Sequence, residues 1–327
     1  MPLDARSHVL LSGGTGFFGC ALLRHWLAAA RQGLQTPTVT VLARAPQRFL
    51  QRFPEFAQEP WLRFHPSDIL QPQTLPWAGS FTHVLHAATE STLGPQLPAL
   101  VRFQQIVDGT RNMLELAQSC QVGRFLLTSS GAVYGPQPAG LPAFPETWLG
   151  MPDPLQTASA YGMGKRCAEH LCALYAQAHG LETVVARCFA FVGSDLPVDV
   201  HFAIGNFIRD AVQADAITVK GDGRAMRSYM DQTDLAHWLI VLLGQGRKGQ
   251  AYNVGSPEAL SMAALAARVR DVVAPGKPVH ILGIPVANSP CQRYIPDVAK
   301  ASLELGLRIT TPLDTAIARS AMTLRHG

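Results

Sequence analysis

Strand-like and helix-like segments alternate through the first 190 residues, and this alternation limits the fold more than any other feature of the chain. Short aliphatic and β-branched runs predict strands, and the longer segments between them carry apolar residues at helical spacing. Such a repetition predicts the α/β class, with a doubly wound parallel sheet and helices on both faces. The expected strands are His8–Ser12, Thr38–Ala43, Leu62–His65, His83–Ala87, Arg124–Ser129 and Thr183–Cys188, and the expected helices are Cys20–Gln32, Phe103–Cys120 and Ala160–His179.

A glycine-rich segment, Gly13-Gly14-Thr15-Gly16-Phe17-Phe18-Gly19, joins the first expected strand to the first expected helix. Glycines allow a tight turn and let backbone N–H groups approach a pyrophosphate, which then lies at a helix N-terminus. An ordinary tight turn is the alternative for such a segment taken alone. Its place between a strand and an amphipathic helix predicts a Rossmann-like dinucleotide site, with contacts from Gly13, Gly16, Phe17, Phe18 and Gly19.

After about residue 190 proline and glycine become more frequent, and short strands are expected among helices near Phe202–Ala214, Asp234–Leu243, Ser261–Val273 and Pro296–Leu305. The short strands are expected at Ile217–Lys220, Tyr252–Val254 and Val279–Leu282. We therefore expect a dinucleotide-binding domain at residues 1–190 and a smaller C-terminal α/β substrate lobe at residues 191–327, interleaved near their boundary.

Composition excludes several other classes of protein. Of 327 residues, 47% are hydrophobic and 15% are charged, a balance that favours a folded globule over disorder. The net charge of +4 comes without a Lys/Arg run, so no nucleic-acid partner is indicated. No signal-peptide pattern opens the chain and no apolar run nears the ~20 residues of a membrane span, so we expect a cytoplasmic protein without a membrane partner. The six cysteines lack metal-ligand spacing, which predicts reduced thiols and no metal site.

The charge of the first 55 residues is unevenly distributed. No carboxylate occurs between Asp4 and Glu55, although arginines recur throughout that stretch. An NAD site usually has Asp or Glu at the end of its second strand to bond the ribose 2′-OH, whereas here that strand ends at Arg44. Arg44 would pair with a 2′-phosphate, so NADP is predicted in preference to NAD. The alternative is that Arg44 is a solvated surface residue and that NAD is bound through the backbone.

Two further segments fit a dinucleotide. Asp68 and Ile69 follow the third strand and would bracket an adenine ring, although Asp68 fits a turn cap equally well. The fourth strand ends with the small-residue segment His86-Ala87-Ala88, which allows backbone to run beside a cofactor or, alternatively, tight packing of a strand on a helix.

Tyr161 and Lys165 are spaced i, i+4 at the start of an expected helix, which places the phenol and the ammonium on one face. A nearby ammonium favours the phenolate and lowers the tyrosine pKa from about 10, as a base that removes an alcohol proton requires. The segment 128–135, Thr-Ser-Ser-Gly-Ala-Val-Tyr-Gly, ends the fifth strand at the edge where doubly wound sheets bind ligands. A hydroxyl there would bond the same substrate oxygen.

The ordered motifs GGTGFFG, HAA, SSGAVYG, YGMGK and YNVGS resemble those of the extended short-chain dehydrogenase/reductases that act on nucleotide sugars, the NAD-dependent epimerase/dehydratase group. The resemblance runs from about residue 8 to about residue 310. It implies that Tyr161 is the catalytic base, that Lys165 also bonds the nicotinamide ribose, and that Ser130, with Ser129 as the alternative, holds the reacting hydroxyl. It also implies a homodimer built on the helices Phe103–Cys120 and Ala160–His179.

The resemblance also implies a substrate, a nucleotide diphosphate sugar. Arg227 and Arg293 are similar to arginines that grip its pyrophosphate, and two guanidinium groups suit such an anion. Relatives commonly carry Asn where Ala190 stands, so we expect His201 or Asn206 to contribute to the grip instead.

Gly131 and Ala132 stand where dehydratases of this group carry Asp-Glu and decarboxylases keep a Glu. Because neither side chain transfers protons, the sequence favours a nucleotide-sugar epimerase, which needs only Tyr, Ser, Lys and hydride. The alternatives are an NADP-dependent ketosugar or carbonyl reductase, a dehydratase with atypical acid and base residues, and, least favoured, a protein that binds NADP without catalysis. The base and sugar of the substrate stay open.

Overall fold

The computed structural model describes residues 3–89, 94–200, 202–286 and 290–326. The chain forms two compact units, each assembled from several segments. Unit 1 contains the residues up to Val133, Pro152–Arg187 and Ala236–Tyr252. Unit 2 contains Tyr134–Met151, Cys188–Leu235 and the residues from Asn253 onward.

A seven-stranded sheet forms the centre of unit 1, in the order β11-β6-β5-β4-β1-β2-β3. The pairs β1–β2, β2–β3, β1–β4 and β4–β5 are all parallel. The order reverses beside β1, as in doubly wound sheets. The expected Rossmann-like α/β fold is therefore confirmed. The strands are β1 (His8–Ser12), β2 (Thr38–Ala43), β3 (Leu62–Pro66), β4 (His83–His86), β5 (Arg124–Ser130), β6 (Glu182–Cys188) and β11 (Gln250–Val254).

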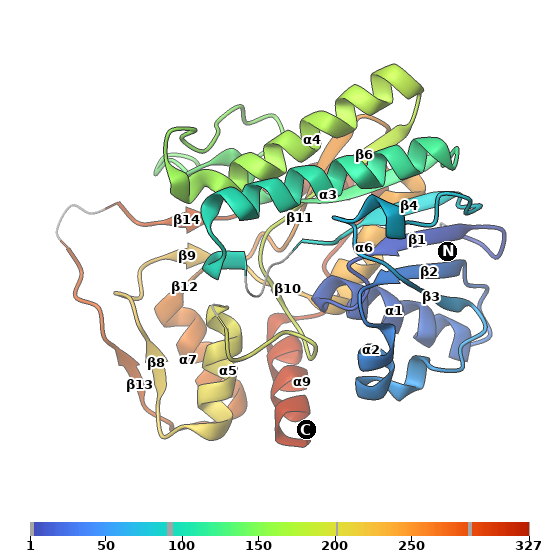
Figure 1. Ribbon diagram of the computed structural model, residues 1–327. Coiled ribbons are helices and arrows are strands. Elements are labelled where there is room, and N and C mark those ends of the chain that lie inside the picture. The colour runs from blue at the N-terminus through green and yellow to red at the C-terminus, as the bar shows by residue number, and fades with distance from the viewer. Residues whose placement is uncertain (1–2, 90–93, 201, 287–289, 327) are drawn as a thin grey trace. The chain divides into compact units, whose positions relative to one another are not determined.

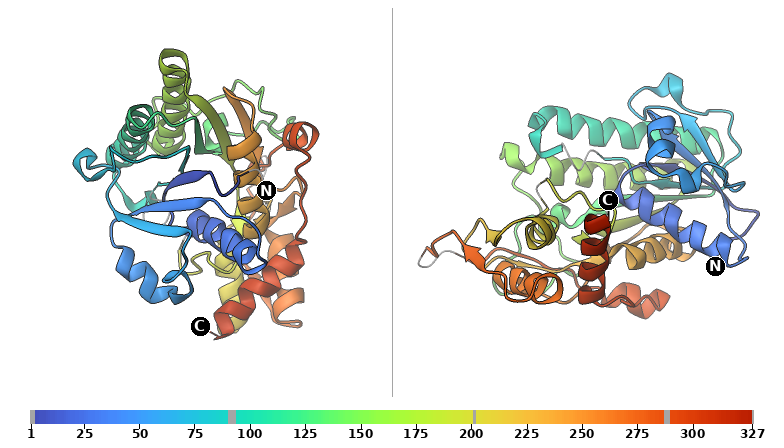
Figure 2. Two further views of the ribbon diagram at one scale, coloured as in Figure 1. Left: turned by 90° about the vertical axis from the view of Figure 1, so that its right-hand side faces the viewer. Right: turned by 90° about the horizontal axis from the view of Figure 1, so that it is seen from below.

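Helices cover both faces of this sheet (Figures 1 and 2). The long helices α3 and α4 lie side by side on one face, and α1 and α6 lie on the other. Residues such as Leu10, Ile106 and Leu127 are buried between the sheet and α3, because central parallel strands are apolar on both faces. The helices are α1 (Phe17–Arg31), α2 (Pro46–Arg52), α3 (Ala99–Ser119), α4 (Ala160–His179) and α6 (Gln232–Gln245).

Two elements from beyond residue 190 lie largely in unit 1. The strand expected at Tyr252–Val254 is β11, which forms the sheet edge beside β6, and most of α6 lies in unit 1. Both were expected in the C-terminal lobe. Local periodicity identifies such segments but does not state which sheet they join, because strand pairing depends on contacts distant in sequence.

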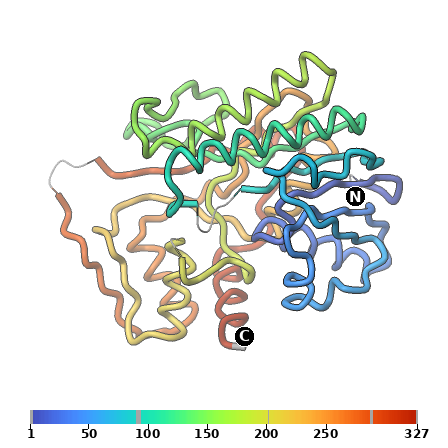
Figure 3. Tube along the Cα trace, viewed as in Figure 1, coloured from blue at the N-terminus to red at the C-terminus, as the bar shows by residue number. Residues whose placement is uncertain are grey.

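Unit 2 consists of short strands and helices. A three-stranded sheet has the order β12-β9-β14, and β7 pairs with β10. The strands β8 and β13 are far apart in the sequence but pair in parallel, and their segments run side by side in Figure 3. The strands are β7 (Phe191–Val192), β8 (Ile217–Val219), β9 (Met226–Arg227), β10 (Met230–Asp231), β12 (Leu260–Ser261), β13 (Val279–Ile281) and β14 (Arg293–Tyr294), and the helices are α5 (Ala203–Gln213), α7 (Met262–Val273), α8 (Ala299–Leu305) and α9 (Leu313–His326).

All six cysteines lie within the described ranges, and none of them forms a disulfide there. Among the same residues, every helix is too short or too polar to cross a membrane.

Candidate functional site

The glycine-rich turn after β1 lies against the carboxyl end of β4. Gly13 has a φ of +76°, and a Cβ atom there would approach the backbone of Ala87 to 2.6 Å and Ala88 N to 2.7 Å. Only glycine fits this conformation and this contact. The turn leads to Gly16, the N-cap of α1, which has no side chain to cap the first helical turn. Such a helix start suits a pyrophosphate, so the residues here fit a dinucleotide.

Phe17 and Phe18 are the first residues of α1, with ring centroids 6.0 Å apart. Gly19 lies in the first turn of the helix, where a Cβ atom would approach the backbone of Gly14 to 2.2 Å. The predicted contact residues of the loop are thus gathered within one turn and the first helical residues.

A cavity of about 390 Å³ opens at the carboxyl ends of β2 and β3 and brings Arg44 and Asp68 together. Asp68 Oδ1 accepts a hydrogen bond from the Leu70 backbone N–H, so this carboxylate caps a turn. Ile69 packs against the core, and its carbonyl accepts a hydrogen bond from Asn112 Nδ2. Contacts of Asp68 and Ile69 with an adenine ring stay predictions.

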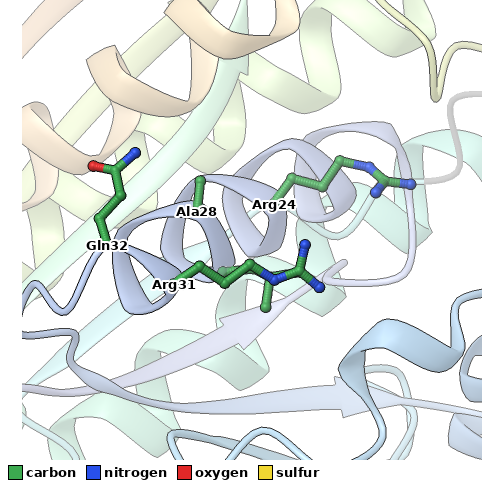
Figure 4. Close-up of a pocket in the computed structure, with 5 residues that line it drawn as sticks. Arg24, Ala28, Arg31 and Gln32 are labelled. Carbon is green, nitrogen blue, oxygen red and sulfur yellow. The ribbon is translucent and has the colours of Figure 1, made fainter.

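A second cavity, of about 360 Å³, lies along α1 and is lined by Arg24, Leu27, Ala28, Arg31 and Gln32 (Figure 4). Its arginines have structural explanations. Arg24 pairs with Glu55 at 3.0 Å, and Arg31 lies in the last turn of α1, where a cation offsets the helix dipole.

The His86 side chain points into the core and is only 3% exposed. Its Nδ1 lies 2.7 Å from Ser12 Oγ, and its Nε2 lies 3.2 Å from Thr110 Oγ1. Burial, and secondarily the charge of Lys165, lowers the pKa of His86 to about 3, so the ring is neutral near pH 7. A cofactor contact at this segment would therefore come from backbone or from Ala87 and Ala88.

Lys165 is the buried cation of the site, 3% exposed on α4. Its Nζ donates hydrogen bonds to Thr89 Oγ1 and to the Thr128 carbonyl, each at 2.8 Å. These bonds connect the helix to the carboxyl ends of β4 and β5. Both of these acceptors are neutral groups.

Tyr161 lies one turn before Lys165 and packs partly against the core. The Arg102 guanidinium lies 4.3 Å from the centroid of the Tyr161 ring, within the range of a cation–π contact. Sequence reasoning missed Arg102, because it lies on α3 and only the packing of α3 on α4 brings it to Tyr161.

The two candidate serines at the end of β5 have different surroundings. Ser129 Oγ donates to Glu169 Oε1 at 2.5 Å, and Glu169 forms a largely buried ion pair with Arg187 at 2.7 Å. Ser130 Oγ accepts a hydrogen bond from the Ala132 backbone N–H at 3.2 Å. The Ser129 hydroxyl is therefore committed to Glu169, and the choice between the two serines for a substrate oxygen stays a prediction.

The segment after Ser130 is closely packed. A Cβ atom on Gly162 would come within 2.7 Å of the Ala132 carbonyl oxygen, so α4 begins directly against this backbone. Gly131 and Ala132 themselves offer no group that transfers protons.

The candidate substrate arginines of unit 2 lie on adjacent strands. Arg227 pairs with Tyr294, and Arg293 pairs with Met226, in a parallel register. Directly paired residues share a face of the sheet and neighbours in sequence alternate, so the two arginine side chains leave opposite faces. Their convergence on one diphosphate stays a prediction.

The other predicted substrate residues after residue 190 are Asn206 and His201. Asn206 Nδ2 donates to the Val200 carbonyl, and Asn206 Oδ1 accepts from Arg209. His201 lies outside the described residues.

The buried Asn253 accepts a hydrogen bond from the Tyr134 hydroxyl at 2.8 Å and donates to the Phe144 and Asp297 carbonyls. These bonds explain the tyrosine of SSGAVYG and the asparagine of YNVGS as structural residues.

Comparison with known proteins agrees with this arrangement. Residues 9–255 match the model of the NAD dependent epimerase/dehydratase family. UDP-glucuronic acid decarboxylase 1 of Danio rerio is 35% identical over 210 residues, which cover 64% of this chain but 49% of that protein, so the match spans about half of its length. UDP-glucuronic acid decarboxylase 3 of Arabidopsis thaliana is 30% identical over 305 residues, or 91% of this chain and 83% of that protein.

A solved structure with a similar fold is UDP-glucuronic acid 4-epimerase from Bacillus cereus in complex with UDP-glucuronic acid and NAD. It superposes with a TM-score of 0.80 at 20% identity and covers 98% of this chain and 99% of that chain. At this identity the likeness establishes the fold. The family model, which spans most of the chain, confirms the resemblance seen in the motifs. The chain therefore belongs to the NAD dependent epimerase/dehydratase family.

Proposed function

We propose that this protein uses a nicotinamide dinucleotide to oxidise a hydroxyl of a nucleotide sugar and to reduce the resulting ketone, with epimerisation as the net reaction. The observation that carries the proposal is that Lys165 Nζ bonds the Thr128 carbonyl at the carboxyl end of β5, where Ser130 lies, with Tyr161 one turn earlier on α4. The named relatives, which act on UDP-glucuronic acid, support a nucleotide sugar as substrate.

The bound dinucleotide would supply the acceptor for hydride from the substrate carbon and would return that hydride later. The glycine loop from Gly13 to Gly19 would hold its pyrophosphate. Tyr161, as phenolate, would take the proton of the substrate hydroxyl while the C–H bond loses hydride, and would give the proton back when the ketone is reduced. Lys165 stabilises the phenolate by its charge, and Ser130 orients the reacting oxygen.

Epimerisation is favoured over elimination because Gly131 and Ala132 supply no acid or base next to Ser130. A decarboxylase is the second candidate, and the two named relatives of that activity favour it. A uronic acid oxidised at C4 is a β-keto acid, which can lose CO₂ without a further acid or base.

UDP-glucuronic acid distinguishes these reactions in one assay. An epimerase yields the isomeric uronic acid with no CO₂, whereas a decarboxylase yields a UDP-pentose and one CO₂ per turnover. A ketosugar reductase would consume NADPH stoichiometrically with a keto sugar. If a panel of UDP-, dTDP-, GDP- and CDP-sugars gives no product and no absorbance change of the nicotinamide, the proposed function is wrong. Tyr161→Phe serves as the inactive control.

We also propose that the cofactor is NADP rather than NAD. Arg44 lines the cavity at the ends of β2 and β3, and no carboxylate precedes it between Asp4 and the end of β2. A guanidinium at this place would pair with the 2′-phosphate. Arg44→Ala should then weaken NADP far more than NAD, while Arg48→Ala, on the neighbouring helix α2, should change neither. Equal losses for both cofactors would contradict the proposal.

We further propose that the protein forms a homodimer with α3 and α4 at the interface. The two helices pack on one another, and Leu174 of α4 is 45% exposed, so an apolar side chain is available for a second copy. Sedimentation velocity of the purified protein measures this directly.

A further inference from the structure

Three buried side chains, Ser12, His86 and Thr110, form a continuous chain of hydrogen bonds through the core of unit 1. They are 0%, 3% and 1% exposed. Ser12 ends β1 immediately before the glycine loop, His86 ends β4, and Thr110 lies in the middle of α3. Three elements that surround the expected dinucleotide site are thus joined by one polar chain.

The direction of each bond can be assigned from the available hydrogens. Thr110 has one hydroxyl hydrogen, which it donates to the Ile106 carbonyl at 2.8 Å. Toward His86 Nε2 it can therefore act only as an acceptor, so the proton of the neutral ring lies on Nε2. Nδ1 is then the acceptor, and Ser12 donates its hydroxyl hydrogen to it. Ser12 Oγ in turn accepts from the Ala88 backbone N–H at 3.4 Å.

The opposite tautomer satisfies fewer groups. With the proton on Nδ1, Thr110 would have to turn its hydrogen from the Ile106 carbonyl to Nε2. The Ser12 hydroxyl would receive two donors and would lose the acceptor for its own hydrogen among the residues that the structure describes. Each lost bond in a buried site costs free energy, because the polar group is left without a partner, so the first arrangement is preferred.

We propose that His86 is a positioning residue of the dinucleotide site: its neutral ring, protonated at Nε2, orders a one-directional chain from the Ala88 N–H to the Ile106 carbonyl and thereby holds the Ala87–Ala88 backbone against Gly13. The role in cofactor binding rests on the proposed function, whereas the tautomer does not. A shift of this backbone matters because it lies within 2.7 Å of where a Cβ atom of Gly13 would be.

The two residues that accept hydrogen bonds from Lys165 are both bonded to the end of β4. Thr128 Oγ1 donates to the His86 carbonyl at 3.2 Å, and the Thr128 carbonyl accepts from Lys165. Thr89 Oγ1 donates to the Ala88 carbonyl at 2.9 Å and accepts from Lys165. The end of β4 therefore connects the glycine loop to Lys165, and the hydrogen bonds of the His86 ring to Ser12 and Thr110 hold that end in place.

The tautomer can be tested without any ligand. Long-range ¹H–¹⁵N correlation spectra of ¹⁵N-histidine-labelled protein, with the His86 signals assigned by their loss in His86→Gln, show which ring nitrogen is protonated. We expect the unprotonated nitrogen to be Nδ1. In Thr110→Val, which keeps the shape but removes the acceptor, the Nδ1-protonated form should appear. A wild-type ring protonated at Nδ1 would overturn the proposal.

Cofactor affinity tests the positioning role. Thr110→Val should raise the Kd for NAD and NADP alike, by roughly threefold to tenfold, because the ordered backbone must be rebuilt on binding. Thr40→Val is the matched control, since Thr40 is also buried and bonded to a histidine, His8, at 2.9 Å, but at the other end of β1. Equal changes in both variants, or none in Thr110→Val, would refute the role. If the wild type binds neither dinucleotide, the proposed function fails, and the tautomer is still decided by the spectra.

Discussion

The pH dependence of stability offers a quantitative test of the buried His86. The pKa of this ring is lowered to about 3 by burial, whereas an unfolded histidine titrates near 6.5. Between these values the unfolded chain binds one proton that the folded chain does not. The contribution of His86 to the unfolding free energy is therefore fully present above about pH 6.5. It is lost at about 1.4 kcal/mol for each pH unit below that value.

The measurement compares wild type with His86→Gln by urea unfolding at pH 7.5 and pH 5.0. At pH 7.5 the variant should be less stable, by about 1–3 kcal/mol, because buried partners lose their bonds. At pH 5.0 protonation of His86 in the unfolded chain has lowered the unfolding free energy of the wild type by about 2 kcal/mol, a loss that the variant does not have. The difference in unfolding free energy between wild type and variant should therefore narrow by that amount. The pKa values of His8, His25 and His83 are also lowered by burial, but these rings are present in both proteins and cancel in the difference.

A difference in unfolding free energy that stays constant between the two pH values would refute the reasoning, since it would mean that His86 takes up a proton in the folded state as easily as in the unfolded chain. A difference in unfolding free energy that is larger at pH 5.0 than at pH 7.5 would refute the reasoning too. His8→Gln is the control. Because His8 is less deeply buried, the difference in unfolding free energy between wild type and this variant should change less between the two pH values.

Three further results are expected. Gly13→Ala should abolish dinucleotide binding in a calorimetric titration, because the new methyl group meets the β4 backbone, whereas Gly180→Ala, which also has a positive φ but nothing within 4 Å, should cost only about 1 kcal/mol in urea unfolding. Glu169→Gln should destabilise the fold by about 3 kcal/mol by leaving Arg187 without its carboxylate partner, and the double variant with Arg187→Met should recover part of that loss; no recovery would contradict a buried pair. Leu174→Glu should shift sedimentation toward a monomer with the far-UV spectrum unchanged, and an unchanged sedimentation coefficient would argue against the α4 interface.

Much of unit 1 could be predicted from local pattern. The expected bounds of β1, β2 and α4 agree with the structure, because alternating apolar runs, glycine stops and helical spacing act over a few residues. The presence of a tight glycine turn was likewise predictable, since it depends on the glycines themselves, whereas its contact with the end of β4 was not. Helix α3 begins at Ala99, earlier than the expected Phe103, and α2 and α9 were not expected at all. Element ends and short helices depend on tertiary packing more than on periodicity.

The sequence by itself determined the class of fold, the place of the glycine-rich loop and the spacing of Tyr161 and Lys165 by one helical turn. Only the tertiary structure decided which residues surround them. It placed β11 in the main sheet, committed Ser129 to Glu169, brought Arg102 from α3 to the Tyr161 ring, and turned His86 into the core. These contacts join residues distant along the chain, and a hydrogen bond or ring contact between such residues leaves no periodic trace in the sequence.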